Sequence, residues 1–191
     1  MKSIKETKEK VIYHLKITLR GSKPTIWRRI QVASDIKLST LHDVIQITMG
    51  WEHSHLHQFI VDGVYYGEIF KGDFDTGDTE DEKKVKLFQV MEAPKSKIFY
   101  EYDFGDSWEH EIVLEEILPA TAKKVPSVCL AGERACPPED CGGVWGYEEL
   151  LRVIKNPTDP DYEDRMEWLG DDFDPEVFDI NEVNEILKLI K

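Results

Sequence analysis

The stretch YEYDFGDSWEH, residues 100–110, organises the structure that the sequence predicts. Alternating aromatic and polar side chains on both sides of a Phe-Gly-Asp-Ser turn predict two antiparallel strands, residues 98–103 and 108–116. The same stretch crowds aromatic rings, carboxylates and an imidazole round one glycine. That is more chemistry than a plain hairpin needs, so the stretch is also the first candidate for a functional site.

Working outward, apolar alternation predicts strands over residues 11–19, 26–32, 55–61 and 64–69, the last two joined by an Asp-Gly hairpin turn. Helical spacing predicts helices over residues 39–49, 147–154, 160–169 and 179–190. The proline- and cysteine-rich segment 119–143 is expected to be irregular. We therefore predict an α+β fold with a mostly antiparallel sheet of about six strands, helices packed on it and a helical C-terminal part. Residues 1–9 are expected to be a flexible tail and residues 10–191 a single domain.

The charge of the chain is distributed unevenly. The net charge is -14, yet residues 1–30 hold nine Lys and Arg against two Asp and Glu. The overall charge disfavours nonspecific nucleic-acid binding, because affinity for phosphates depends on basic contacts. A basic N-terminal hairpin could still contact DNA through five side chains: Lys16, Arg20, Lys23, Arg28 and Arg29. No apolar run is long enough for a spanning helix, so we expect a cytoplasmic protein with no membrane partner.

Two groups of side chains have the chemistry of metal ligands. His53, His55 and His57 alternate, which would place them on one strand face, and neutral imidazoles there can share one ion. The structural alternative is that His53 ends a turn, His55 forms hydrogen bonds at the core edge and His57 is solvated.

Asp103, Asp106 and His110 form the second group, since they flank one turn and could bind a divalent cation or transfer protons. These three are the candidate catalytic residues. The structural alternative is that Asp106 caps the turn amides and Gly105 adopts an unusual φ, while Phe104 and Trp108 fill the core.

Three cysteines, Cys129, Cys136 and Cys141, lie within one short segment. Their spacing is not that of common zinc ribbons, but three thiolates with one histidine such as His110 could hold a structural zinc. Zinc is therefore the one cofactor that the sequence suggests, with His55 and His57 as further candidate ligands. The alternative is a set of buried structural thiols.

Several motifs, read in order, resemble one family: the plasmid pRi ORF-three-like family, named for an open reading frame of a root-inducing plasmid. The motifs are Pro24-x-x-Trp27-Arg28-Arg29, Leu41-His42, Gly50-Trp51, His55-Leu56-x-x-Phe59, residues 102–110, CPPEDCGG at 136–143, and Phe173-Asp174-Pro175-Glu176-x-Phe178. The resemblance extends from about Tyr13 to Leu189. It implies an association with plasmids or insertion elements, some of whose passenger proteins are described as resolvase-like. It supplies no catalytic residues.

The sequence favours a binding or adaptor domain over an enzyme. The expected recognition cleft lies between the YDFGDSWEH and CPPEDCGG motifs and is lined by Tyr102, Trp108, His110, Glu139 and Asp140. Its partner would be a small ligand or a protein. One alternative is a metal-dependent hydrolase or nuclease-like enzyme that uses His55, Asp103, Asp106 and His110, and the other is the DNA-contacting hairpin.

Overall fold

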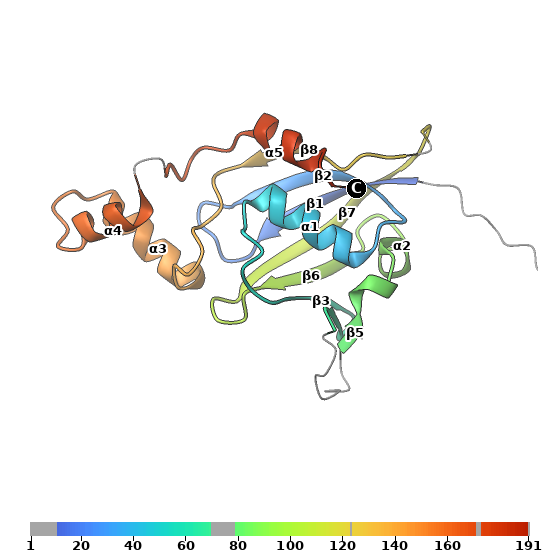
Figure 1. The fold of residues 1–191 in the computed structure, drawn as a ribbon, viewed down its shortest axis with the longest axis horizontal. Helices are drawn as coiled ribbons and strands as arrows, with labels where there is room; N and C mark the ends of the chain where they lie inside the picture. Colours follow the sequence, from blue (N-terminus) through green and yellow to red (C-terminus); the bar gives the residue numbers. More distant parts are fainter. Residues whose placement is uncertain (1–10, 70–78, 123, 171–172, 191) are drawn as a thin grey trace, which may run out of the picture.

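The structure is a computed structural model that describes residues 11–69, 79–122, 124–170 and 173–190 (Figure 1). The predicted tail, residues 1–9, lies outside these ranges. In the described ranges, eight strands form one sheet in the order β5-β4-β3-β6-β7-β1-β2-β8. Neighbouring strands are antiparallel except for β4 and β5, which are parallel. The strands are β1 (Val11–Leu19), β2 (Trp27–Ala33), β3 (His57–Val61), β4 (Val64–Gly67), β5 (Thr79–Asp81), β6 (Lys97–Tyr102), β7 (Trp108–Pro119) and β8 (Val128–Glu133).

The α+β class and the mostly antiparallel sheet are as predicted, but the estimate of about six strands was too low. The two additional strands lie at the sheet edges. β5 has the sequence TED, which contains no apolar residue, and β8 lies within the segment expected to be irregular. Both pair with a neighbouring strand at an edge of the sheet. Neither has the alternating hydrophobic pattern from which a strand is predicted in the sequence.

The helices divide into two groups. α1 (Leu38–Met49) and α5 (Ile180–Leu187) lie on one face of the sheet, while α3 (Gly143–Ile154) and α4 (Tyr162–Leu169) extend beyond its end (Figure 1). A short 3-10 helix, η1 (Glu82–Lys84), and α2 (Leu87–Val90) follow β5. The predicted cap of the last helix is confirmed, since Asp179 accepts hydrogen bonds from the amides of Asn181 and Glu182. None of the described helices is long and apolar enough to cross a bilayer.

The core lies between α1 and the sheet. On β1, Tyr13, Leu15, Ile17 and Leu19 are all buried, as their period of two predicts. The predicted apolar stripe of α1 packs against this layer from above. The sheet face beneath α1 therefore excludes water, and the polar side chains that project into this layer need partners within the protein.

Arg28 is the largest charged side chain in this layer and is fully buried. Its guanidinium donates to the backbone carbonyls of Thr48, Glu133 and Arg134 at 2.6, 2.8 and 2.7 Å, and to that of its neighbour Trp27 at 2.9 Å. Arg28 thus ties the C-terminal end of α1 to the end of β8. Burial lowers the pKa of Arg28 to about 10, which still leaves the group charged at neutral pH.

Candidate functional site

Two loops that are far apart in the sequence meet at one end of the sheet. The Tyr102 hydroxyl, at the end of β6, donates to Glu139 Oε1 at 2.9 Å. The amide of Gly142 donates to Asp106 Oδ2 at 3.1 Å. A Cβ added to Gly143 would lie 2.5 Å from the carbonyl oxygen of Asp106, so glycine is required for this close approach. The YDFGDSWEH and CPPEDCGG motifs are therefore adjacent, as the expected cleft required.

The contact brings one imidazole and three carboxylates together. His55 Nε2 lies 3.8 Å from Asp103 Oδ2, 3.7 Å from Glu139 Oε2 and 3.4 Å from Asp140 Oδ1. We call His55, Asp103, Glu139 and Asp140 the His55 cluster. Its members come from three loops: the one before β3, the one after β6 and the CPPEDCGG segment. Such convergence from separate segments is what a ligand site requires.

Two atoms of the cluster are buried without a hydrogen bond. Among the described residues, the buried side-chain atoms that lack a partner are His55 Nε2, Glu139 Oε2 and Trp108 Nε1. The first two face one another, and a buried polar atom without a partner costs roughly 1–3 kcal/mol. A bound cation would satisfy both at once.

The second carboxylate oxygen of Glu139 and that of Asp103 accept hydrogen bonds from the surrounding protein. Glu139 Oε1 accepts from the Tyr102 hydroxyl and, at 2.8 Å, from the amide of Glu52. Asp103 Oδ1 accepts from the amide of Gly105 at 2.9 Å. Each group therefore uses one oxygen for support and directs the other toward His55, which is the pattern of supported metal ligands.

The backbone at this site is strained. Asp103, Ser107 and Asp140 have positive φ values of 57, 50 and 56°, a region that non-glycine residues seldom occupy. The sequence instead assigned the unusual φ to Gly105, which is wrong. A Cβ at Gly105 would lie 3.2 Å from Asp103 Oδ1, the oxygen to which its amide donates, so a larger residue would press on this carboxylate.

A hollow of about 210 Å³ adjoins Glu139. Its lining presents polar and apolar surface in similar amounts and consists of Gly50, Glu52, Cys136, Pro137, Pro138, Glu139, Trp168, Leu169 and Phe173. It lies between the CPPEDCGG segment and α4. A hollow of this kind beside a charged cluster suits a small ligand or a peptide side chain.

The residues expected to line the cleft behave differently from one another. Tyr102, Trp108 and His110 are completely buried, so they cannot line an accessible surface. His110 Nδ1 donates to the carbonyl oxygen of Tyr100 at 3.3 Å, and His110 Nε2 accepts from the indole N–H of Trp51 at 3.5 Å. Glu139 and Asp140 do face the site.

The four proposed hydrolase residues divide in the same way. His55 and Asp103 come together, whereas Asp106 is engaged with Gly142 and His110 lies in the core. The structural alternative for Trp108 as a core residue is confirmed. Phe104 is 48% exposed and does not fill the core, because its turn projects beyond the end of the sheet.

The histidine series does not share one strand face, because β3 begins only at His57. His53 contacts His42, and His55 joins the carboxylates. The expectation that His57 is solvated is wrong, since its side chain is 8% exposed and its Nε2 lies 2.9 Å from Glu82 Oε2. Because the loop before β3 is irregular, His53, His55 and His57 point in different directions.

The cysteines do not assemble a zinc site. Within the described ranges, no group of three metal-ligating side chains close enough to share one ion contains a cysteine. Cys129 bonds to Ala131 O, and all three thiols are free. Burial raises the pKa of Cys136 and raises that of Cys141 to about 12, so both stay protonated at neutral pH.

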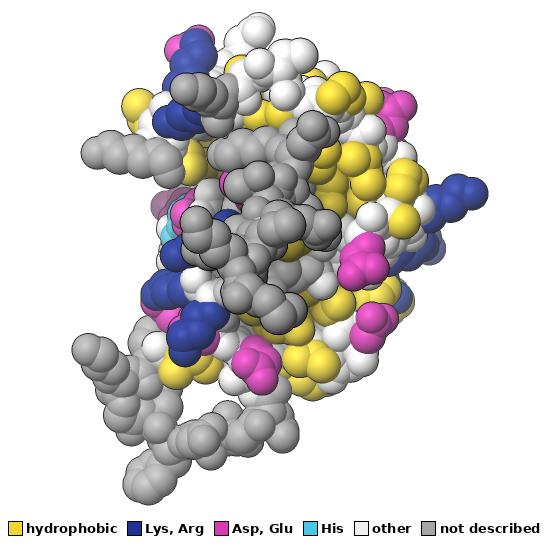
Figure 2. Space-filling model, turned by 90° about the vertical axis from the view of Figure 1, so that its right-hand side faces the viewer, with side chains coloured by type: hydrophobic (Ala, Val, Ile, Leu, Met, Phe, Trp, Pro, Cys, Tyr) yellow, Lys and Arg dark blue, Asp and Glu magenta, His cyan; other side chains and the backbone are white. Residues whose placement is uncertain are grey.

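The basic hairpin is largely neutralised by its own sheet. Arg29 pairs with Glu115 at 2.5 Å, Arg20 pairs with Glu109, and Arg28 is buried. Lys16 lies over the ring of Trp27, at 5.2 Å. On the face shown in Figure 2, Lys and Arg side chains lie near Asp and Glu side chains. The arrangement therefore gives the DNA-contacting alternative no support.

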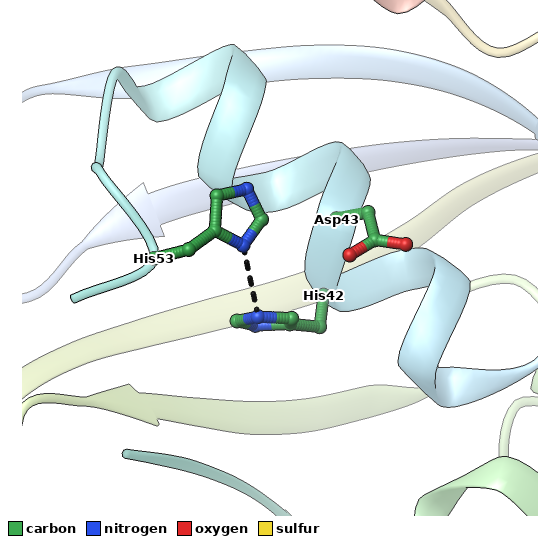
Figure 3. Close-up of side chains that lie close together, drawn as sticks. All are labelled: His42, Asp43 and His53. Carbon is green, nitrogen blue, oxygen red and sulfur yellow. Dashed lines mark hydrogen bonds between the residues drawn. The ribbon is translucent and has the colours of Figure 1, made fainter. Parts of the chain in front are cut away.

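Sequence reasoning missed one polar cluster. His42 and Asp43, on α1, lie beside His53, on the loop that follows (Figure 3). The Leu41-His42 motif contained one of its members, a histidine beside a buried leucine on an amphipathic helix. His53 lies eleven residues further along the chain, so only the fold shows that the two are adjacent.

Comparison with known proteins supports the family resemblance. The sequence profile of the Plasmid pRiA4b ORF-3-like protein family matches residues 11–182, and the chain belongs to this family. It is 37% identical over 177 residues to the uncharacterized protein y4hQ of Sinorhizobium fredii (strain NBRC 101917 / NGR234), a match that covers 91% of this chain and 89% of the relative. The crystal structure of MM3350, a protein of unknown function from Methanosarcina mazei Go1, superimposes with a TM-score of 0.81 at 42% identity and covers 92% of this chain and 98% of that one.

Proposed function

We propose that the protein is a cation-dependent ligand-binding domain whose divalent cation is held by the His55 cluster. The observation that carries the proposal is the pair of buried atoms His55 Nε2 and Glu139 Oε2, which face one another at 3.7 Å without hydrogen bonds. A charge-assisted hydrogen bond would bring such atoms to about 2.8 Å. Two ligands of one ion, each about 2.0–2.2 Å from it, stand roughly 3.0–3.6 Å apart, which is closer to what is seen.

The donor set indicates the class of cation. His55, Asp103 and Asp140 each offer a ligand atom within 4.8 Å of the other two, and Glu139 faces His55 from a further side. Imidazole and carboxylate ligands suit divalent ions of the manganese-to-zinc series, while thiolate-preferring ions would find no sulfur ligand here. The four groups also carry a formal charge of -3 when the imidazole is neutral. A divalent cation would offset most of that charge.

The adjoining hollow indicates how a ligand would bind. Glu139 belongs both to the His55 cluster and to the lining of the hollow. A ligand with an apolar part could place that part against Pro138, Trp168 and Leu169 and direct an anionic or carbonyl end toward the cation. This arrangement supports the binding-domain prediction, with the recognition surface moved to the α4 side of the CPPEDCGG segment.

Metal content tests the proposal directly. Untagged protein would be loaded with Mn²⁺ or Zn²⁺, desalted and measured by elemental mass spectrometry, together with His55→Ala and Glu139→Gln. Glu116→Gln is the matched control, because Glu116 also pairs with a histidine, His14, but on the sheet surface. We expect both cluster variants to hold about one equivalent of metal less than the wild type and the control. Wild-type protein that retains no metal at this site, or cluster variants that retain it fully, would overturn the proposal.

One observation also favours a metal-dependent hydrolase. The Asp140 side chain is 75% exposed, so the cluster is open to solvent on that side and a bound ion could carry a water molecule. The enzyme would use His55 and Asp103 from the predicted set and not Asp106 or His110. Turnover of a chromogenic phosphodiester or ester by Mn²⁺-loaded protein, lost in His55→Ala and kept in Glu116→Gln, would identify a hydrolase. Metal binding without turnover of either probe would leave the binding domain.

A further inference from the structure

A second cluster of polar side chains lies between α1 and the loop before β3. His53 Nδ1 is 3.3 Å from His42 Nε2, and a carboxylate oxygen of Asp43 lies within 4.8 Å of both histidines (Figure 3). The figure shows His42 and Asp43 at neighbouring positions of the helix, with the ring of His42 next to that of His53. Two imidazoles and one carboxylate are the donor set of many catalytic zinc sites.

The spacing of the two nitrogens fits a shared ion. With metal–nitrogen distances of about 2.0–2.1 Å, two ligands at a tetrahedral angle stand roughly 3.3 Å apart. His42 and His53 already have this separation, so an ion could enter without rearrangement of either ring. The position of His53 on an exposed loop gives the ion a route in from solvent.

One glutamine positions both histidines. The side-chain amide of Gln46 donates to the hydroxyl of Tyr100 at 2.9 Å, and that hydroxyl is 2.8 Å from His42 Nδ1. The side-chain oxygen of Gln46 accepts from the backbone amide of His53 at 2.9 Å. His53 is held in a left-handed conformation, with φ 57°, by this contact. Buried groups that orient ligands in this way are typical of metal sites.

Burial disfavours the charged forms of two members of the cluster. It lowers the pKa of His42 to about 2, with smaller contributions from His57 and His53. Burial also raises the pKa of Asp43, which is the cost that a nearby cation would offset. His57 stacks on His42 with ring centroids 3.5 Å apart, but its Nε2 is engaged by Glu82, so it is not a ligand.

We propose that His42, Asp43 and His53 form a second divalent-metal site, separate from the His55 cluster and selective for nitrogen-preferring ions such as Zn²⁺ and Co²⁺. The alternative is a plain hydrogen bond between the two imidazoles. The two differ in a measurable way, since a metal site responds to the ion and a hydrogen bond does not.

The experiment titrates metal-free protein with Zn²⁺ and follows the ring nitrogens of each histidine by NMR, with a parallel Co²⁺ titration followed by visible absorption. The variants are His53→Ala and Asp43→Asn, with His14→Ala as control for an imidazole outside both clusters. The Glu139→Gln variant isolates the second site. We expect Zn²⁺ to shift the His42 and His53 signals in the wild type, in His14→Ala and in Glu139→Gln.

In the same experiment, His53→Ala and Asp43→Asn should weaken Zn²⁺ binding at this site at least about tenfold, and Gln46→Leu should weaken it about 10–100-fold with both rings still present. Zn²⁺ that leaves both ring signals unmoved in the wild type, or that binds His53→Ala unchanged, would overturn the proposal. Because Glu139→Gln removes only the His55 cluster, failure of one site is distinguishable from failure of the other.

Discussion

Arg28 lies over the ring of Phe178, with its Cζ 3.8 Å from the ring centroid. The guanidinium is therefore enclosed by backbone carbonyls in its plane and by an aromatic face above it. Within the described part of the chain, its hydrogen-bond acceptors are backbone carbonyls and include no carboxylate, so its charge is stabilised by dipoles and a ring rather than by an ion pair. The relationship explains two motifs at once, Trp27-Arg28-Arg29 near the start of the chain and the segment that ends at Phe178.

Replacing Arg28 by lysine should destabilise the fold by about 2–4 kcal/mol. A lysine keeps the charge but cannot reach carbonyls on both α1 and β8, so buried acceptors lose their donors. Urea unfolding measures the change, with Arg20→Lys as the exposed control, expected within about 0.5 kcal/mol of the wild type. Equal stabilities for the two variants would contradict the role of Arg28 in holding the end of α1 against the end of β8.

Gly132→Ala should disrupt the same contact from the opposite side. A Cβ at this position would lie 2.6 Å from Phe178 Cε1 and 2.7 Å from Arg28 Cδ, so we expect a loss of about 1–3 kcal/mol. Much of that loss should disappear when the change is made in a Phe178→Leu background, where the ring is absent. A double-mutant cycle by urea unfolding gives the coupling, and strict additivity would argue against the clash.

His110 should make stability depend on pH. Burial lowers its pKa to about 4 from an ordinary value near 6.5. Between these pH values the unfolded chain binds more protons than the folded chain. The free energy of unfolding therefore has its full value above about pH 7 and falls as the pH drops through 6.5 toward 4. From pH 7.5 to pH 5 the wild type should lose ~2 kcal/mol more than His110→Gln, measured by urea unfolding at both pH values. A parallel loss in the two proteins would refute this assignment.

The thiols should react slowly in the folded protein. Burial raises the pKa of Cys129, Cys136 and Cys141, and the thiolate is the reactive form. At pH 8, reaction with Ellman's reagent should be at least about tenfold slower in buffer than in concentrated urea, where all three cysteines react. One thiol that reacts fast in buffer would show that a cysteine is exposed and ionised, and would favour a redox role for that residue.

Much of the fold was predictable because its central elements repeat a clear pattern. β1, β2, β6 and β7 alternate in burial, and the Asp62-Gly63 turn joins β3 to β4 as expected. β5 and β8 were not predictable in this way. Their pairing depends on edges that exist only after the central strands have formed, and neither the polar sequence of β5 nor the sequence VCLAGE of β8 alternates between apolar and polar residues.

The candidate site was predictable in its components and not in its grouping. The aromatic and acidic stretch and the CPPEDCGG segment were both identified, and Asp103, Glu139, Asp140 and His55 were all named. Sequence reasoning placed His55 and Asp103 together in the hydrolase alternative but added Asp106 and His110, which are neighbours of Asp103 in the hairpin. A positive φ at Asp103 turns its carboxylate toward His55 instead, and burial removes His110.

The loop between α1 and β3 carries one ligand for each proposed ion, His53 for one and His55 for the other. Only Ser54 separates them, and its amide is fixed by the hydroxyl of Tyr102 at 3.0 Å. If one ion orders this loop, the binding of the other ion costs less conformational entropy of the loop. By reciprocity, each ion then alters the affinity of the other by the same factor, so a short loop would let the protein respond to two metal concentrations together.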